Sequence, residues 1–183
     1  PRIDDIQITN NSWGNPSHGT HLAFAGGLLT STLANTVETG RGGRGTIHVF
    51  SAGNYGDVGD DVNYDTLKNS IYCILAAAIS QDGTAEPYSN PGAALVVGAP
   101  GGAPSGPQIV TTDLVGGTYG YNQSSSAGEL SSRDYTRYFA GTSASAPMVS
   151  GVVALMLQAN PNLGWRDVQE ILLRSATHNA PTD

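Results

Sequence analysis

Two continuous apolar segments constrain the fold of this chain more than any other feature. Residues 46–51 are rich in β-formers, and residues 71–79 form the longest apolar run. Strands that are apolar without alternation are typical of a parallel sheet buried on both faces. Shorter segments at residues 6–9, 95–97 and 109–111 predict further strands. The chain is therefore predicted to be α/β, with a mostly parallel sheet and helices in right-handed crossovers between strands.

Two helices are predicted from apolar residues at helical spacing. Residues 22–39 carry Leu29, Leu33 and Val37 four apart, and the turn Gly40-Arg41-Gly42-Gly43 ends this helix. Near the C-terminus one apolar face of a last helix is formed by Trp165, Val168, Ile171 and Leu172. Residues 116–134 are rich in Gly and Ser and predict a loop. The 183 residues fit one domain or a large part of one.

A candidate nucleophile lies in the segment Ala140-Gly141-Thr142-Ser143-Ala144-Ser145-Ala146-Pro147. Apolar residues at helical spacing follow it up to Gln158, so we expect Ser143 at the start of a helix, with Pro147 in its first turn. The unpaired N–H groups and the dipole at such a position stabilise a developing oxyanion. The alternative is an N-cap serine before an ordinary core helix.

Composition narrows the possible partners. A formal charge of −7 argues against nucleic acid and is compatible with a basic substrate, and no apolar run reaches the 18 or so residues of a membrane span. Cys73 lies in an apolar run and is expected to be an inert buried thiol. A loop with acids at Asp57, Asp60, Asp61 and Asp65 can bind calcium or simply be a solvated turn.

The segment Gly-Thr-Ser-Ala-Ser-Ala-Pro resembles the nucleophile motif of subtilisin-like serine proteases, and its spelling looks most like the kexin and furin branch. Further likeness covers nearly the whole chain, at Asn11-Ser12-Trp13-Gly14, at Val49-Phe50-Ser51-Ala52-Gly53-Asn54, and at the segments 108–113 and 165–169. The resemblance implies a three-layer subtilisin-like fold, of which residues 1–183 are expected to be an incomplete C-terminal portion of the catalytic domain. It also allows for a β-sandwich domain after residue 183. It also implies a secreted or extracytoplasmic enzyme.

The resemblance assigns roles residue by residue. It implies that Ser143, rather than Ser145, attacks the peptide bond and that Asn54 supports the oxyanion. The residues expected to line the cleft and pair with an extended substrate are Ser12, Trp13, Gly14, Ser51, Ala52 and Gly53. Expected partners are a peptide or protein substrate, a propeptide or chaperone, and the missing part of the catalytic domain.

The sequence does not offer a catalytic histidine at the position that the resemblance implies. His18-Gly19-Thr20-His21 spells a string that carries the catalytic histidine in many subtilases, but here it follows the Ser-Trp-Gly strand instead of preceding it. We therefore interpret His18 as a lookalike and expect the catalytic aspartate and histidine on upstream sequence, so that the chain alone is nearly inactive. Asp4 or Asp5 could be offered as the acid that orients His18, but we do not assign that role to either, because His18 itself is in the wrong position relative to the Ser-Trp-Gly strand.

The same resemblance places a calcium ligand at Asp60 and the acid of the primary specificity pocket at Asp65, which implies a preference for Arg or Lys before the scissile bond. Two further family acids fall on Ser17 and Asn90, so this specificity is expected to be weakened. Two alternatives stay open. One is a non-catalytic subtilase-like binding domain, and the other is a metal hydrolase that uses His18 and His21.

Overall fold

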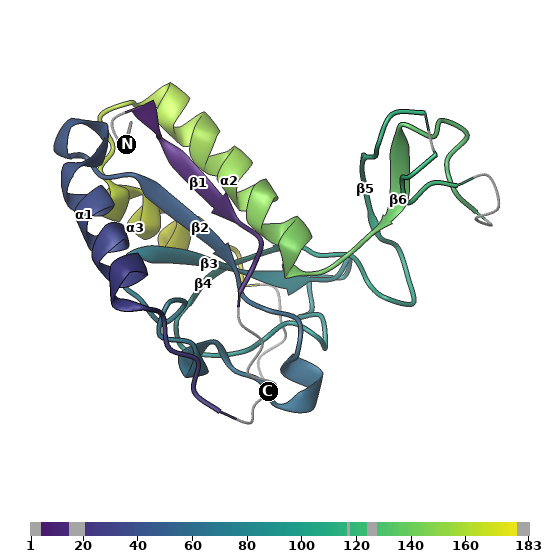
Figure 1. Cartoon of the computed structure of the whole chain (residues 1–183), viewed down its shortest axis with the longest axis horizontal. Helices are drawn as coiled ribbons and strands as arrows, with labels where there is room; N and C mark the ends of the chain where they lie inside the picture. The colour runs from purple at the N-terminus through teal and green to yellow at the C-terminus, as the bar shows by residue number, and fades with distance from the viewer. Residues whose placement is uncertain (1–4, 15–20, 117, 124–127, 179–183) are drawn as a thin grey trace.

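A four-stranded parallel sheet forms the centre of the molecule (Figure 1). The structure, a computed structural model, describes residues 5–14, 21–116, 118–123 and 128–178. The strands lie in chain order, and they are β1 (Ile8–Asn11), β2 (Ile47–Ser51), β3 (Cys73–Ile79) and β4 (Leu95–Pro100). The predicted parallel sheet is confirmed, and each predicted strand starts or ends within a few residues of the observed one.

Both faces of the sheet are buried, which explains the lack of alternation in the sequence. On one face Ile47, Val49 and Ile74 belong to a core that includes α2 and α3. On the opposite face Phe50 and Leu75 pack with Leu33 of α1. Because side chains along a strand point alternately to the two faces, a strand covered on both sides is mostly apolar and shows no alternation.

Three helices complete the layers, namely α1 (Gly27–Gly43), α2 (Thr142–Ala159) and α3 (Trp165–Ser175). Helix α1 covers one face of the sheet, and α2 and α3 cover the other. Two short 3-10 helices, η2 (Gly56–Val58) and η3 (Val62–Tyr64), lie in the loop between β2 and β3. The arrangement is the predicted three-layer α/β fold.

The boundaries of α1 differ from the predicted ones. The helix begins at Gly27 and not at Leu22, since Ala23 is extended and bridges to Asp65. The predicted turn at its end is present within the last residues of α1, where Arg41 adopts a left-handed conformation with φ of 54°. Arg41 is buried there and donates from Nε to Gln7 Oε1 at 3.0 Å, so this turn also anchors the segment before β1.

A two-stranded antiparallel arm projects from the layered body (Figure 1). It pairs β5 (Ile109–Thr112) with β6 (Tyr135–Phe139). Strand β6 was not predicted, because it directly follows the Gly- and Ser-rich loop and only Thr136 in it is buried. The arm ends at Gly141, so it leads the chain directly into α2.

Two titratable side chains are buried inside the layers. His48 on β2 lies between the hydroxyls of Thr9 and Thr36, each 2.8 Å from a ring nitrogen, and burial lowers the His48 pKa to about 4. Cys73 is buried as predicted, and burial raises the pKa of its thiol to about 12. Both groups are therefore uncharged at neutral pH, consistent with structural roles.

By length and composition alone, α2 is apolar enough to cross a membrane. The core helix of a globular domain passes the same test, and α2 packs against all four strands of the sheet. We therefore interpret α2 as a core helix.

Candidate active site

A cleft of about 300 Å³ opens where β1 and β2 end and α2 begins. Its lining brings together residues from four distant segments of the chain. They are Ser12, Trp13, Gly14, Ser51, Gly53, Asn54, Tyr55, Asp60, Lys68 and Ser143. Most of the residues predicted from the sequence are therefore in one place, and Tyr55 and Lys68 are additions.

Ser143 is the second residue of α2 and is half-buried at the cleft. The turn before it depends on Gly141, which has φ of 111° and donates its N–H to Gly101 O at 2.7 Å. A Cβ at this position would lie 3.1 Å from Asn54 Nδ2. Glycine is thus needed both for the backbone conformation and for the close approach to Asn54. The N–H of Ser143 belongs to the first turn of α2, whose N–H groups have no partner within the helix.

Pro147 lies deeper in α2 than predicted, since the helix starts at Thr142 and not after the motif. Inside a helix, a proline cannot donate to the carbonyl four residues earlier, which here is that of Ser143. That carbonyl instead accepts a hydrogen bond from Ser12 Oγ at 3.0 Å. In return, Ser143 Oγ lies 3.4 Å from Ser12 O. The proline therefore frees the backbone of Ser143 to be tied to the segment after β1.

The second serine of the motif has a different environment. Ser145 is fully buried, and its hydroxyl donates to Ala99 O of β4 at 3.0 Å. It does not line the cleft. These contacts give Ser145 a structural role and leave Ser143 as the serine that a substrate can reach.

Asn54 is held in one orientation by Thr142. Its Oδ1 accepts hydrogen bonds from Thr142 N and Thr142 Oγ1, both at 2.8 Å. Thr142 Oγ1 in turn accepts from Gly53 N at 3.0 Å. With both donors on Oδ1, the amide group Nδ2 is left as a donor that has no protein acceptor among the described residues. A donor fixed in this way in the same cleft as a serine is the kind of group that can stabilise a tetrahedral oxyanion.

The walls of the cleft come from the ends of two paired strands. Residues 12–14 follow β1 and residues 51–53 end or follow β2, and β1 and β2 pair in parallel up to Asn11 and Phe50. The exposed ring of Trp13 packs edge-on against Phe50, with centroids 5.6 Å apart. Ala52 was expected to line the cleft but is fully buried, and its carbonyl oxygen accepts from Lys68 Nζ at 3.1 Å.

Asp65 is not at the cleft surface. Its Oδ1 accepts from Leu67 N at 2.9 Å, its Oδ2 lies 4.0 Å from Lys68 Nζ, and it does not line the cleft. Lys68 takes that place. Burial lowers the Lys68 pKa, and the carboxylates of Asp65 and Asp60 oppose this effect. Sequence reasoning missed Lys68 because a lysine in a polar turn is usually exposed.

No histidine hydrogen-bonds to Ser143 Oγ in the part of the chain that the structure describes. His48 is enclosed by threonines within the layers, and His21 is exposed and does not line the cleft. His18 and Ser17, and with them the alternative of a His18/His21 metal site, fall outside the described residues. The described residues contain no group of three or more His, Cys, Asp or Glu that could hold a metal ion.

Calcium at Asp60 stays a prediction, and the surroundings of Asp60 do not fit it well. Calcium takes six to eight oxygen ligands. Asp60 Oδ2 instead accepts a hydrogen bond from the amide group Nδ2 of the buried Asn90 at 2.9 Å, and Asp60 acts on the nearby ammonium of Lys68. An amide donor and an ammonium group therefore lie near Asp60, where a calcium ion would need oxygen ligands.

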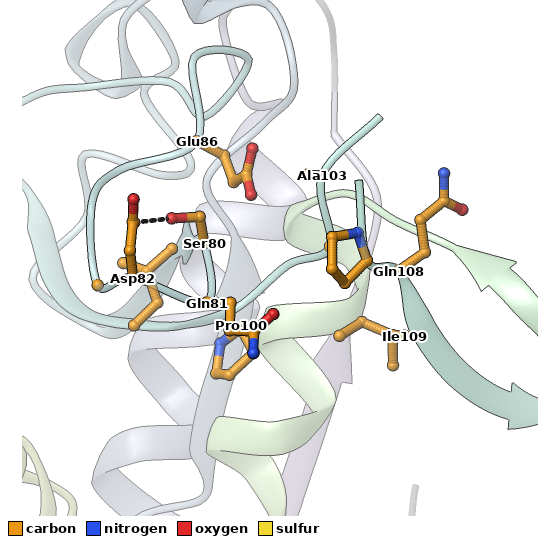
Figure 2. Close-up of a pocket in the computed structure, with 12 residues that line it drawn as sticks. Ser80, Gln81, Asp82, Glu86, Pro100, Ala103, Gln108 and Ile109 are labelled. Atoms are coloured by element: carbon orange, nitrogen blue, oxygen red, sulfur yellow. Dashed lines mark hydrogen bonds between the residues drawn. The ribbon is translucent and has the colours of Figure 1, made fainter. Parts of the chain in front are cut away.

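A larger cavity of about 850 Å³ lies elsewhere on the carboxyl side of the sheet, bounded by the ends of β3 and β4 and the start of β5 (Figure 2). Ser80 donates a hydrogen bond to Asp82 at its rim. Glu86 is buried, with Oε1 lacking a hydrogen-bond partner among the described residues. This cavity contains no serine beside an oriented amide donor, so the smaller cleft is the better candidate for chemistry.

Comparisons with known proteins identify the family of the chain. Residues 3–183 match the model of the Subtilase family. The chain is 38% identical to kexin of Saccharomyces cerevisiae over 174 residues, which are 95% of this chain and 19% of that protein. It is 36% identical to human proprotein convertase subtilisin/kexin type 4, covering 93% of this chain and 20% of that one. The chain thus spans about a fifth of these relatives.

Among solved structures, the serine protease of Aeromonas sobria in complex with a chaperone superposes with a TM-score of 0.83 at 26% identity, over 93% of this chain and 33% of that one. A cold-adapted subtilisin-like serine proteinase shares the fold, with a TM-score of 0.67 at 21% identity and coverage of 94% of this chain and 49% of that one. With the family model spanning almost the entire chain, the protein belongs to the Subtilase family, and its similar relatives are of the kexin type.

Proposed function

We propose that this chain provides the nucleophile and the oxyanion donor of a serine endopeptidase that works through an acyl-enzyme on Ser143. The observation that carries the proposal is the pair formed by Ser143 and Asn54. Ser143 opens α2 at a cleft, and the Asn54 amide is turned by Thr142 so that Nδ2 is left to donate. The rival idea of a non-catalytic binding domain gives no reason for this arrangement.

In the proposed reaction, Ser143 Oγ attacks the carbonyl carbon of the scissile bond and passes its proton to a base. The tetrahedral oxygen accepts hydrogen bonds from Asn54 Nδ2 and from the N–H of Ser143. Collapse of the intermediate expels the amine, which takes the proton from the base, and water then hydrolyses the ester. From the order of the motifs alone, in which His18 follows the Ser-Trp-Gly segment, we propose that the base and its orienting aspartate are supplied by other sequence of the full-length protein.

The cleft walls support an extended peptide as substrate. Residues 12–14 and 51–53 leave paired strands on either side of it, and strand ends of this kind can bind a peptide by main-chain hydrogen bonds. A chaperone or propeptide partner is proposed from the likeness to the Aeromonas sobria protease, whose structure was solved in complex with a chaperone. An extracytoplasmic location is proposed on family likeness alone.

A preference for Arg or Lys before the scissile bond was expected from Asp65. We leave this preference out of the proposal, because Asp65 is away from the cleft surface and already faces Lys68. Structural calcium at Asp60 likewise remains a prediction without support from its surroundings.

The experiment is active-site labelling of the full-length protein that contains this chain with a fluorophosphonate probe. We expect labelling of the unmodified protein and of Ser145→Ala, but not of Ser143→Ala. Ser145 is the matched control because it lies in the same turn of α2 with its hydroxyl bonded to β4. Labelling that persists in Ser143→Ala and disappears in Ser145→Ala would overturn the assignment.

Peptide hydrolysis provides the second arm of the same experiment. Losing triad members commonly costs several powers of ten in rate, with a residue of activity from the oxyanion hole. Residues 1–183 alone should therefore be nearly inactive. Robust hydrolysis by this segment that is abolished by His18→Ala would show that the base lies on the chain itself.

A further inference from the structure

The side chain of Lys68 lies in the cleft beside the nucleophile, and neither the family likeness nor the predicted site accounts for it. Lys68 is only 5% exposed, yet it lines the same cleft as Ser143 and Asn54. Its stem comes from the turn between η3 and β3, where most lysines would face solvent. A buried lysine beside reactive groups calls for a physical account.

The ammonium group lies between the two walls of the cleft. A Cβ on Gly14 would come within 2.9 Å of Lys68 Nζ, and a Cβ on Gly53 within 3.2 Å. Lys68 Nζ also donates to Ala52 O at 3.1 Å. The charge is thus held inside the cleft, between residues 12–14 and 51–53.

Two buried carboxylates face this ammonium. Asp65 Oδ2 lies 4.0 Å from Nζ, and Asp60 contributes a second attractive charge. Asp60 is 4% exposed and Asp65 6% exposed. A cation of the chain itself therefore already compensates one of the two negative charges that would attract a cation from outside. Lys68 supplies the positive charge that a calcium ion or a basic substrate side chain would bring.

We propose that Lys68 determines specificity, so that the cleft selects a side chain ending in an oxygen acceptor, such as Gln or Glu, over Arg or Lys before the scissile bond. The inference rests on the proposed endopeptidase function. An entering Arg or Lys meets an ammonium at close range, and like charges repel in a site of low dielectric. An entering carboxamide or carboxylate instead accepts a charge-assisted hydrogen bond from Nζ.

The first test is a panel of peptides that differ only in the residue before the scissile bond, run on the full-length protein without substitution. Hydrogen bonds to charged groups contribute about 1.5–3 kcal/mol, which corresponds to about ten- to a hundredfold in kcat/KM. We expect kcat/KM for Gln and Glu to exceed that for Arg and Lys by such a factor. A panel led by Arg or Lys would overturn the proposal.

Variants distinguish Lys68 from other causes of the same ranking. Lys68→Met keeps the length of the stem and unmasks Asp60 and Asp65, so the ranking should reverse in favour of Arg. Lys68→Met combined with Asp65→Asn removes one of the two unmasked carboxylates and returns the cluster to its original net charge, so it serves if the single variant folds poorly. We expect a weaker reversal in this double variant. An unchanged ranking in the folded double variant would also contradict a role for Lys68 in selection.

Fluorophosphonate labelling of Ser143 separates this inference from the proposed function. The probe carries no side chain for the cleft to select. If Ser143 is labelled but the peptides with Arg are cleaved fastest, the proposed endopeptidase function stands and only the role of Lys68 is contradicted. Absence of labelling in the unmodified protein removes the proposed function itself.

Discussion

The two cavities on the carboxyl side of the sheet differ in whether their buried charged side chains have partners. In the cleft beside Ser143, Lys68 faces the carboxylates of Asp60 and Asp65. In the larger cavity, Glu86 is 4% exposed and its Oε1 has no partner among the described residues, although its charge helps burial to raise the pKa of Tyr88 to about 12. In the cleft the chain provides a cation for the buried carboxylates, whereas in the larger cavity Glu86 Oε1 has no hydrogen-bond partner among the described residues. The size of a cavity is therefore a poor guide to chemistry, and the arrangement of its polar groups is a better one.

The largest expected effect is on the free energy of unfolding, and it concerns Lys68 and the two carboxylates that face it. Lys68→Met leaves two buried carboxylates without their cation, and breaking a buried pair on one side typically costs about 3 kcal/mol or more. We expect the free energy of unfolding to fall by about that amount in denaturant titration. The double variant with Asp65→Asn should recover a large part of the loss. Equal stability of Lys68→Met and the unmodified protein would contradict the claim that the ammonium balances the cleft.

The next effect concerns the rate of the reaction. Removing one oxyanion donor typically lowers kcat by about 10²–10³, and we expect this loss in Asn54→Ala of the full-length protein with little change in KM. Asn54→Ala also removes the acceptor of the buried Thr142, so we expect the free energy of unfolding to fall by about 1 kcal/mol, too little to unfold the protein. Thr142→Ser, which keeps the hydroxyl that holds Asn54 Oδ1, is the matched control and should retain most of the activity. A loss below threefold in Asn54→Ala would remove this donor from the mechanism.

The smallest expected effect is a gain in the free energy of unfolding, and it concerns Glu86 in the larger cavity. Glu86→Gln removes a buried charge that lacks one partner, and we expect the free energy of unfolding at neutral pH to rise by about 1 kcal/mol. Gln81→Ala, an exposed side chain lining the same cavity, should change it little. Activity should stay within twofold of the unmodified protein. Destabilisation in Glu86→Gln, or a large loss of activity, would erase the contrast between the two cavities.

Elements with one dominant physical signal were predictable from the sequence. The strands at residues 47–51 and 73–79 were found because burial on both faces leaves continuous apolar runs. The start of α1 was predicted too early, since residues before Gly26-Gly27 look helical in isolation but are held extended by the segment around Asp65. Strand β6 carries only one buried residue and so left no pattern to detect.

The residues of the candidate site were predictable where they belong to a distinctive sequence motif. Ser143, Asn54 and the wall residues were identified from motifs, and the structure brings nearly all of them to one cleft. Asp65 was assigned to the cleft surface by likeness alone, and a lysine three residues later replaces it there. Burial of Lys68 arises from packing between Gly14 and Gly53, and contacts between such distant segments are not encoded in any local spacing.

The hydrogen bond between Ser12 and Ser143 joins residues that are 131 positions apart. A ribosome releases a chain from its N-terminus at about 5–20 residues per second, so the wall of the cleft emerges several seconds before the serine that would cut. Pairings of such long range also form slowly. The cleft can therefore close only after Ser143 has been synthesised, and its walls leave the ribosome well before the hydroxyl of Ser143 does.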